Sequence, residues 1–129
     1  MNSIARIASY SLVLLVLFSS LALAAPPECP EQSTEQAISC LVGAIANSHL
    51  VFIRNGEKHS SDEAVKHMMD KYNYCKSRVK TPEDFIRLCG SKSFLSGKPY
   101  LVETPQGTLP TEEWLMGVLA KYREGQKSF

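Results

Sequence analysis

The chain carries almost no net charge, and this shortage weighs against several classes of function. Its 129 residues contain 14 Lys and Arg against 13 Asp and Glu, a formal net charge of +1 with the histidines neutral. Proteins that bind nucleic acid need a clear basic excess to displace the counterions of the phosphate backbone. The balance therefore weighs against a nucleic-acid partner. It also weighs against simple electrostatic attachment to anionic lipid.

The sequence also lacks the motifs that identify a reaction. Gly97-Lys98 has no correctly spaced upstream glycine and is followed by Pro99, so it is not a nucleotide phosphate loop. No nucleophile elbow surrounds a serine, and the three histidines do not follow the H-x-x-x-H order of a zinc site. We therefore expect no cofactor and no metal. The sequence favours a non-catalytic protein and leaves enzymatic activity open.

Long apolar runs are absent except within the first 24 residues. There, one positive charge at Arg6 precedes the apolar residues 12–18, and Ala22-Leu23-Ala24 follows as a small-x-small sequence of the type that signal peptidase cleaves. The apolar stretch is shorter than the roughly 20 residues that a bilayer span needs. We therefore expect residues 1–24 to be a cleaved signal peptide, with no membrane span left after cleavage.

The remainder of the chain predicts one small exported domain. One of the 14 basic residues and none of the 13 acidic residues lies in the signal peptide, so residues 25–129 carry 13 of each sign. Residues 25–32 contain three prolines and are expected to form an extended N-terminal arm. Residues 33–129 have the length of a single soluble domain, and no internal repeat or second domain is visible.

Four cysteines in an exported chain predict two disulfides, for which three pairings are possible. Helical periodicity places Cys75 on the buried face of one helix and Cys89 on the apolar face of the next. If the chain turns back at residues 80–82, these faces meet and favour Cys75–Cys89, which leaves Cys29–Cys40. Two buried free thiols are the alternative. Because C-x-x-C spacing is absent, neither a thiolate metal site nor redox chemistry is indicated.

The hydrophobic pattern predicts a predominantly helical α+β domain. Capping residues and apolar stripes indicate about four helices, near residues 33–46, 60–79, 81–90 and 110–122. Two β-type runs, residues 50–54 and 100–103, are each closed by a turn signal. Because two short strands are not stable alone, we expect them to pair with each other and to lie against the helices. The predicted fold is thus about four helices with a small two-stranded sheet, stapled by disulfides.

Two polar turns are the candidate functional site. The first, around residues 54–61, runs into a helix N-terminus, whose N–H groups and partial positive charge suit an anion. The second, residues 91–100, is rich in serine. If the flanking strands pair, the turns face each other and their polar groups converge. Alternatively, Ser60 and Ser61 only cap the helix, the turns only reverse the chain, and His59 packs over the cap. The candidate binding residues are Arg54, Asn55, Gly56, His59, Ser61, Ser91, Ser93, Ser96, Gly97, Lys98 and Tyr100.

The same turns carry a family resemblance. The sequence resembles the DUF5329 family of small exported bacterial proteins through Phe52-Ile53-Arg54-Asn55-Gly56-x-x-His59-Ser60-x-x-Glu63-Ala64-x-x-His67-Met68, Lys80-Thr81-x-Glu83-Asp84-Phe85-Ile86 and Ser91-x-Ser93-x-x-Ser96-Gly97-Lys98-Pro99-Tyr100. The family has no known function. The resemblance implies a Gram-negative periplasmic location and a binding role for the two turns. The family pattern has other residues at the positions of Cys75 and Cys89, which implies that their disulfide is a local stabiliser.

Three hypotheses for function follow. The leading one is a periplasmic, non-catalytic binding or accessory protein with a shallow polar site. Arg54 and Lys98 supply the charge for an anionic group of a peptide, an envelope glycan or a partner envelope protein. The second is a hydrolase of the cell wall or of peptides that uses His59 with a serine or a metal. The third is an immunity-type inhibitor. The sequence does not predict the oligomeric state.

Overall fold

Capping boxes determine where three of the predicted helices begin. In the computed structural model, which describes residues 33–127, Ser33, Ser60 and Thr81 precede helices α1 (Thr34–Ser48), α2 (Ser61–Cys75) and α3 (Pro82–Phe85). Each hydroxyl accepts a hydrogen bond from the backbone N–H three residues later, and the side chain at that later position accepts one from the N–H of the cap residue. These reciprocal bonds satisfy donors that a helix start would otherwise leave unpaired.

The four predicted helices are confirmed with different ends. The second ends early, as a 3₁₀ turn η1 (Lys76–Arg78), and α3 continues directly as a π-helical turn η2 (Ile86–Gly90). Helix α4 (Thr111–Gln126) runs four residues past the predicted end. Gly90 allows η2 to approach α4 closely, because a Cβ atom at this position would lie 2.8 Å from Cδ1 of Leu115. No helix among residues 33–127 combines the length and apolar character needed to cross a bilayer.

The sheet has four strands, so the predicted two-stranded sheet is wrong. Strands β1 (Val51–Arg54), β2 (Glu57–His59), β3 (Leu101–Thr104) and β4 (Gly107–Pro110) form an antiparallel sheet in the order β2-β1-β3-β4. The two central strands are the predicted ones and pair with each other, with Phe52 opposite Val102. The missed strands are the outer ones. They lack the apolar strand pattern, because β2 is the polar sequence Glu57-Lys58-His59 and β4 begins with Gly107 and ends with Pro110.

The fold repeats a helix, a hairpin and a second helix, although the sequence shows no repeat. The order is α1-β1-β2-α2, then α3-β3-β4-α4, and β1 and β3 meet at the centre of the sheet. Hairpin registers agree at an offset of 50 residues, since Phe52 pairs with His59 and Val102 with Leu109. The alternation of buried and exposed positions over residues 51–61 also recurs over 101–111. Both halves therefore meet the same packing demands with different side chains.

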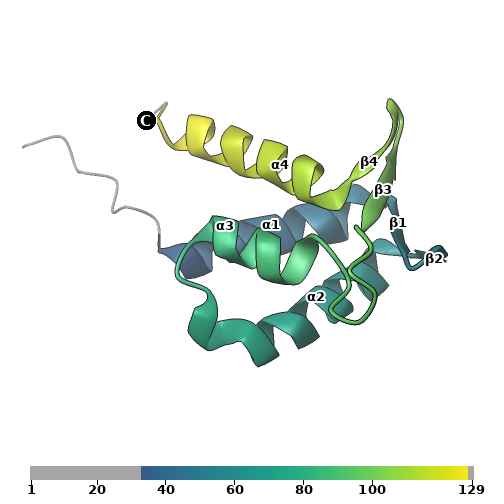
Figure 1. Ribbon diagram of the computed structural model, residues 1–129. Helices are drawn as coiled ribbons and strands as arrows, with labels where there is room; N and C mark the ends of the chain where they lie inside the picture. The colour runs from purple at the N-terminus through teal and green to yellow at the C-terminus, as the bar shows by residue number, and fades with distance from the viewer. Residues whose placement is uncertain (1–32, 128–129) are drawn as a thin grey trace, which may run out of the picture.

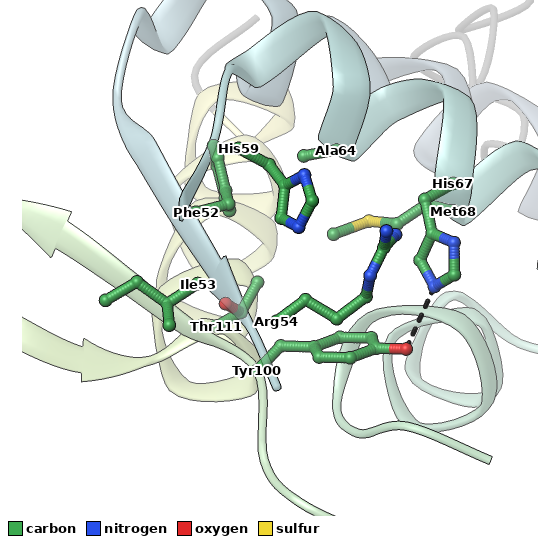
Figure 2. Close-up of a pocket in the computed structure, with 9 residues that line it drawn as sticks. All are labelled: Phe52, Ile53, Arg54, His59, Ala64, His67, Met68, Tyr100 and Thr111. Atoms are coloured by element: carbon green, nitrogen blue, oxygen red, sulfur yellow. Dashed lines mark hydrogen bonds between the residues drawn. The ribbon is translucent and has the colours of Figure 1, made fainter. Parts of the chain in front are cut away.

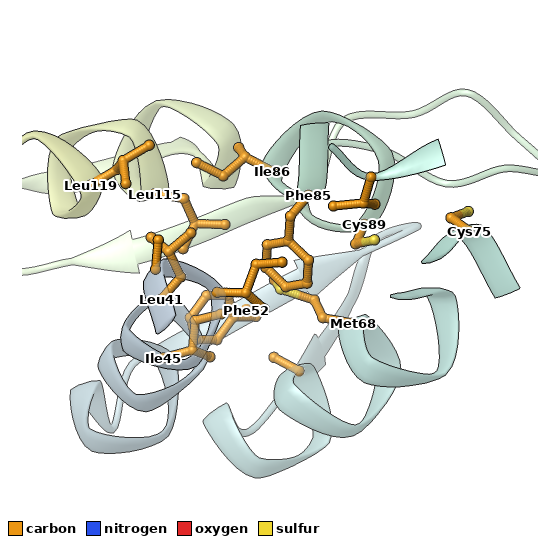
Figure 3. Close-up of a cluster of buried hydrophobic side chains, with 14 of the residues drawn as sticks. Leu41, Ile45, Phe52, Met68, Cys75, Phe85, Ile86, Cys89, Leu115 and Leu119 are labelled. Atoms are coloured by element: carbon orange, nitrogen blue, oxygen red, sulfur yellow. The ribbon is translucent and has the colours of Figure 1, made fainter. Parts of the chain in front are cut away.

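The core lies between the helices and one face of the sheet. Helix α1 contacts α2, α3 and α4, and η2 contacts α2 and α4. In Figure 1, α1 and α3 accordingly lie between α4 and α2, with the strands at one end of the helices. Figure 3 shows the side chains that meet there. The fully buried large residues of the core include Leu41, Ile45, Phe85, Ile86, Val102, Leu115 and Leu119.

The predicted Cys75–Cys89 disulfide is wrong. Both residues are fully buried in the shared core, as the helical periodicity indicated, but both are free thiols. The Sγ atom of Cys75 accepts a hydrogen bond of 3.2 Å from Arg78, and burial raises the pKa of Cys89 to about 11, which keeps this thiol protonated and unreactive. Two cysteines that face the same core can pack there as small apolar side chains. A disulfide requires in addition a narrow range of distances and angles between their Cβ atoms.

The other sequence predictions near the N-terminus fall outside the described residues. These are the signal peptide of residues 1–24, the arm of residues 25–32, and Cys29 as the predicted partner of Cys40. Cys40, on α1, forms no disulfide with the other cysteines of residues 33–127.

The state of the core thiols is directly testable. We predict that a reducing agent leaves the thermal unfolding midpoint of a Cys29→Ser/Cys40→Ser variant unchanged, because Cys75 and Cys89 contribute packing and no covalent link. Scanning calorimetry with and without dithiothreitol measures this. A thiol reagent should label neither residue in the folded protein and both in denaturant. A midpoint that falls on reduction would instead show that the two sulfurs are bonded.

Candidate functional site

The two polar turns lie side by side. Pairing of β1 with β3 brings residues 55–56, at the end of β1, next to the loop that precedes β3. The hydroxyl of Ser96 then donates a 2.7 Å hydrogen bond to Oδ1 of Asn55, across 41 residues of sequence. Asn55 and Gly56 both adopt a left-handed backbone, with φ of 52° and 83°, which makes the tight turn between β1 and β2.

A cavity lies beside this contact, between the β1–β2 hairpin and α2 (Figure 2). Its volume is about 20 Å³, which is room for about one water-sized group. Its lining is largely apolar and comprises Phe52, Ile53, Arg54, His59, Ala64, His67, Met68, Tyr100 and Thr111. A more polar cleft of about 250 Å³ adjoins it, lined by Arg54, His59, Glu63, Lys66, His67 and Asp70. Because Arg54, His59 and His67 line both spaces, they stand at the mouth of the apolar cavity.

Strand alternation and helix periodicity direct these side chains to one place. Phe52 and Arg54 are two residues apart on β1 and so point to the same face of the sheet. His59 pairs with Phe52 in the hairpin register, at the end of β2. On α2, Ala64 and His67 are three residues apart and share the facing side of the helix. The site therefore depends on the hairpin packing against the first two turns of α2.

Arg54 is a half-buried cation without a direct ion-pair partner among the described residues, although the carboxylate of Glu63 lines the same cleft. Its guanidinium makes no hydrogen bond and no ion pair within residues 33–127. Figure 2 shows the side chain reaching across the cavity from β1 toward His67 and Met68 of α2. A guanidinium offers five donors in a rigid planar fork, which matches a carboxylate or a phosphate. The position is therefore equipped to bind an anion.

A hydrogen-bonded chain of three side chains adjoins the cavity: His67 and Tyr100 line it, and Lys71, which does not, bonds to Tyr100. Lys71 is 6% exposed and donates to the carbonyl of Lys92 at 2.6 Å and to the hydroxyl of Tyr100 at 3.3 Å. Since Tyr100 accepts from Lys71, its own hydrogen is directed to Nε2 of His67, 2.9 Å away. Burial, together with the neighbouring cations Arg54 and Lys71, lowers the pKa of His67 to about 4. His67 is therefore neutral near pH 7, accepts at Nε2 and carries its hydrogen on Nδ1.

Two polar atoms in the cavity lining lack partners. The buried Nε2 of His59 and the buried Oγ1 of Thr111 have no hydrogen bond within the described part of the chain. The other ring nitrogen of His59, Nδ1, lies 3.9 Å from the carboxylate of Glu63. A buried polar group without a partner costs about 1–3 kcal/mol of stability, so folding alone does not favour this arrangement. These are the atoms that a hydrogen-bonding group in the cavity can reach.

The structure divides the predicted site residues into two groups. Arg54, His59 and Tyr100 line the cavity, while Asn55 and Ser96 join the two turns above it. The remaining candidates shape the backbone or lie on the surface, and they are Gly56, Ser61, Ser91, Ser93, Gly97 and Lys98.

The serines of this second group have structural partners. The buried hydroxyls of Ser61 and Ser91 donate to the carbonyls of Ala46 and Arg87. Ser93 accepts from the N–H groups of Leu95 and Ser96 and so closes the loop. Gly97 supplies a left-handed position in that loop, and Lys98 is exposed and lines neither space. Arg54 and Lys98 therefore do not meet in one pocket, contrary to the prediction.

Sequence reasoning missed His67 and Lys71 as site residues. Glu63 and His67 are four residues apart on α2, but Glu63 caps the helix and His67 contacts Tyr100. His59 belongs to β2 and His67 to α2, and both line the cavity. The available signal was the buried stripe of α2, which passes through Ala64, Met68 and Lys71 and so includes a charged residue.

The two spaces differ from the catalytic arrangements that the sequence left open. Within residues 33–127, no group of three or more His, Cys, Asp or Glu side chains is placed to hold a metal ion. No serine lines either space beside His59. What the lining does offer is one positive charge, unpaired polar atoms and an apolar wall.

The low pKa of His67 predicts a specific pH dependence of stability. The unfolded chain protonates this histidine near pH 6.5 and the folded protein only near pH 4. Between these values the unfolded chain binds more protons, so this group lowers the free energy of unfolding as the pH falls from 6.5 to 4. Urea unfolding across this range should show a shallower decrease for His67→Gln than for the wild type. Parallel curves for the two proteins would mean that His67 titrates normally.

Comparison with known proteins places the chain in a family. Residues 32–123 match the model of a family of unknown function, DUF5329. The chain is similar to the uncharacterized protein YfeK of Salmonella typhimurium strain LT2, with 39% identity over 67 residues. That match covers 51% of this chain and 56% of the relative, so the chain spans only about half the length of this curated relative. No solved structure matches it significantly. The chain, with the fold and cavity described above, belongs to the DUF5329 family.

Proposed function

We propose that this protein is an exported, non-catalytic binding protein that captures an anionic group at Arg54. The observation that carries the proposal is the half-buried guanidinium at the cavity mouth, which forms no ion pair or hydrogen bond within residues 33–127, although the Glu63 carboxylate lines the same cleft. A partly buried charge is unfavourable unless it is paired, so such a position is retained where a partner supplies the opposite charge.

The structural repeat supports a role beyond folding. At the offset of 50 residues, Arg54 and His59 correspond to Thr104 and Leu109 in the second hairpin. The second half folds in the same register with a small polar and an apolar residue at these positions. The fold therefore does not require an arginine or a histidine there, and a ligand is the simplest reason for both.

The lining indicates the chemistry of the ligand. Arg54 suits a carboxylate, and Nε2 of His59 and Oγ1 of Thr111 offer hydrogen bonds deeper in the cavity. Phe52, Met68 and the ring of Tyr100 provide an apolar wall. A carboxylate bound in the polar cleft, with a methyl-sized apolar substituent facing the small apolar cavity, satisfies both parts, as at the end of a peptide. His67 is already bonded to Tyr100, which favours binding over a role as a general base.

The role of Arg54 is testable against a matched cation outside the cavity. N-acetylalanine serves as the probe, with its dissociation constant taken from chemical-shift titration. We expect Arg54→Gln to weaken binding about tenfold or more, because it removes a charge-assisted pair of hydrogen bonds worth about 1.5–3 kcal/mol. Lys98→Gln should change binding less than about twofold, since an exposed charge is screened.

Stability provides the control for this comparison. Arg54→Gln removes an unpaired charge, so its thermal midpoint should equal or exceed that of the wild type. Equal loss of binding in both variants would show a diffuse surface effect, and unchanged binding in Arg54→Gln would refute the proposed site.

Export is tested separately. The full chain expressed in a Gram-negative host should appear in the periplasmic fraction with Ala25 as its first residue, as measured by mass spectrometry. A Leu14→Arg variant, which interrupts the apolar segment, should remain in the cytoplasm with its N-terminus intact. Wild-type protein retained in the cytoplasm with residues 1–24 attached would contradict export.

A further inference from the structure

The strongly exposed large apolar side chains of the described residues gather at one place. They are Tyr74 on α2, 81% exposed, and Phe94 and Leu95 in the loop before β3, 53% and 100% exposed. The rings of Tyr74 and Phe94 contact each other, with centroids 6.4 Å apart. We call these three residues the apolar tip. Isolated exposed apolar residues are ordinary, but a contiguous group of this kind marks an interaction surface.

The tip is held in place by its own loop. Lys71 lies 4.0 Å from the centre of the Phe94 ring and donates to the carbonyl of Lys92. Ser93 accepts from the N–H of Leu95, and its own N–H donates to the carbonyl of Lys98. The loop therefore presents Phe94 and Leu95 outward through a defined set of bonds, although turning them inward would bury apolar surface.

Positive charge flanks the tip. Lys92 and Lys98 enclose Phe94 and Leu95 in the sequence, and both are exposed. Neither forms an ion pair within residues 33–127, and residues 91–100 contain no acidic side chain. Asp70, one turn before Tyr74 on α2, is neutralised by its 2.9 Å pair with Lys66. The surroundings of the tip are therefore locally basic in a chain of nearly zero net charge.

We propose that the apolar tip inserts into the interface of an anionic lipid membrane. Aromatic and aliphatic side chains next to lysines are the combination that peripheral proteins use, with the apolar groups in the headgroup region and the ammonium groups on lipid phosphates. Leu95 is completely exposed, so it projects outward as a membrane anchor must. The near-zero net charge of the chain argues against membrane attachment by electrostatic attraction alone. In this proposal, burial of the apolar tip also contributes to the binding free energy.

This attachment is independent of the proposed anion site. The tip residues do not line the cavity, and Arg54 is not part of the tip. The Ser96–Asn55 bond nevertheless places the tip on the loop next to the turn above the cavity. Attachment through the tip would hold the cavity close to the membrane surface.

Sedimentation with vesicles tests the proposal. The protein is taken without residues 1–24, whose apolar segment would itself bind lipid, and is mixed with vesicles of phosphatidylcholine alone or of phosphatidylcholine and phosphatidylglycerol in equal parts. Wild-type protein should partition onto the anionic vesicles. Phe94→Ser/Leu95→Ser should lower the partition coefficient about tenfold or more. Lys92→Gln and Lys98→Gln should each lower it about fivefold, and only on anionic vesicles.

Two controls separate insertion from misfolding. Phe94 also contacts Lys71, whereas Leu95 is fully exposed, so Leu95→Ser alone should weaken partitioning without changing the thermal midpoint. Lys121→Gln removes an exposed lysine from α4, which lies across α1 from α2, and should leave partitioning unchanged (Figure 1).

Three results would overturn the proposal. They are wild-type protein that stays in solution with anionic vesicles, partitioning that is equal in Phe94→Ser/Leu95→Ser, or a wild-type dimer in sedimentation velocity that this variant abolishes. The last result would assign the tip to a second copy of the chain.

Discussion

Antiparallel pairing of β1 with β3 is the constraint on which the rest of the structure depends. It joins the two halves of the repeat into one sheet, so that the hairpin after α1 lies beside the loop after η2. The Ser96–Asn55 bond and the Lys71–Tyr100–His67 chain then connect that loop to the hairpin and to α2. Without this pairing, the residues of the cavity would belong to separate surfaces.

Two cationic side chains near the cavity, Lys71 and Arg54, have opposite surroundings. Lys71 is more deeply buried, which lowers its pKa, and it is compensated by a carbonyl, a hydroxyl and two aromatic rings. Arg54 is less buried and has none of these within the described residues. A folded protein normally satisfies its buried polar groups, so the contrast separates a structural cation from one that is available to a ligand.

The repeat clarifies which residues the fold needs. Both halves bury the second residue of the first strand and the first residue of the following helix, as Phe52 and Ser61 in one and Val102 and Thr111 in the other. Only the first half adds Arg54 and His59 between these positions. The exposed apolar residues Phe94 and Leu95 lie in the loop that leads into the second half. The proposed anion site and the proposed membrane contact thus lie where the two halves differ.

The sequence by itself determined the helix starts, the central strands and the proximity of the turns. Capping boxes at Ser33, Ser60 and Thr81 and the apolar strand runs are local signals that tertiary packing did not override. The outer strands, the free thiols of Cys75 and Cys89, and the inclusion of His67 and Lys71 in the site were decided by tertiary structure. Edge pairing, thiol distance and the burial of a polar side chain depend on residues distant in the chain, and periodicity along one segment does not report them.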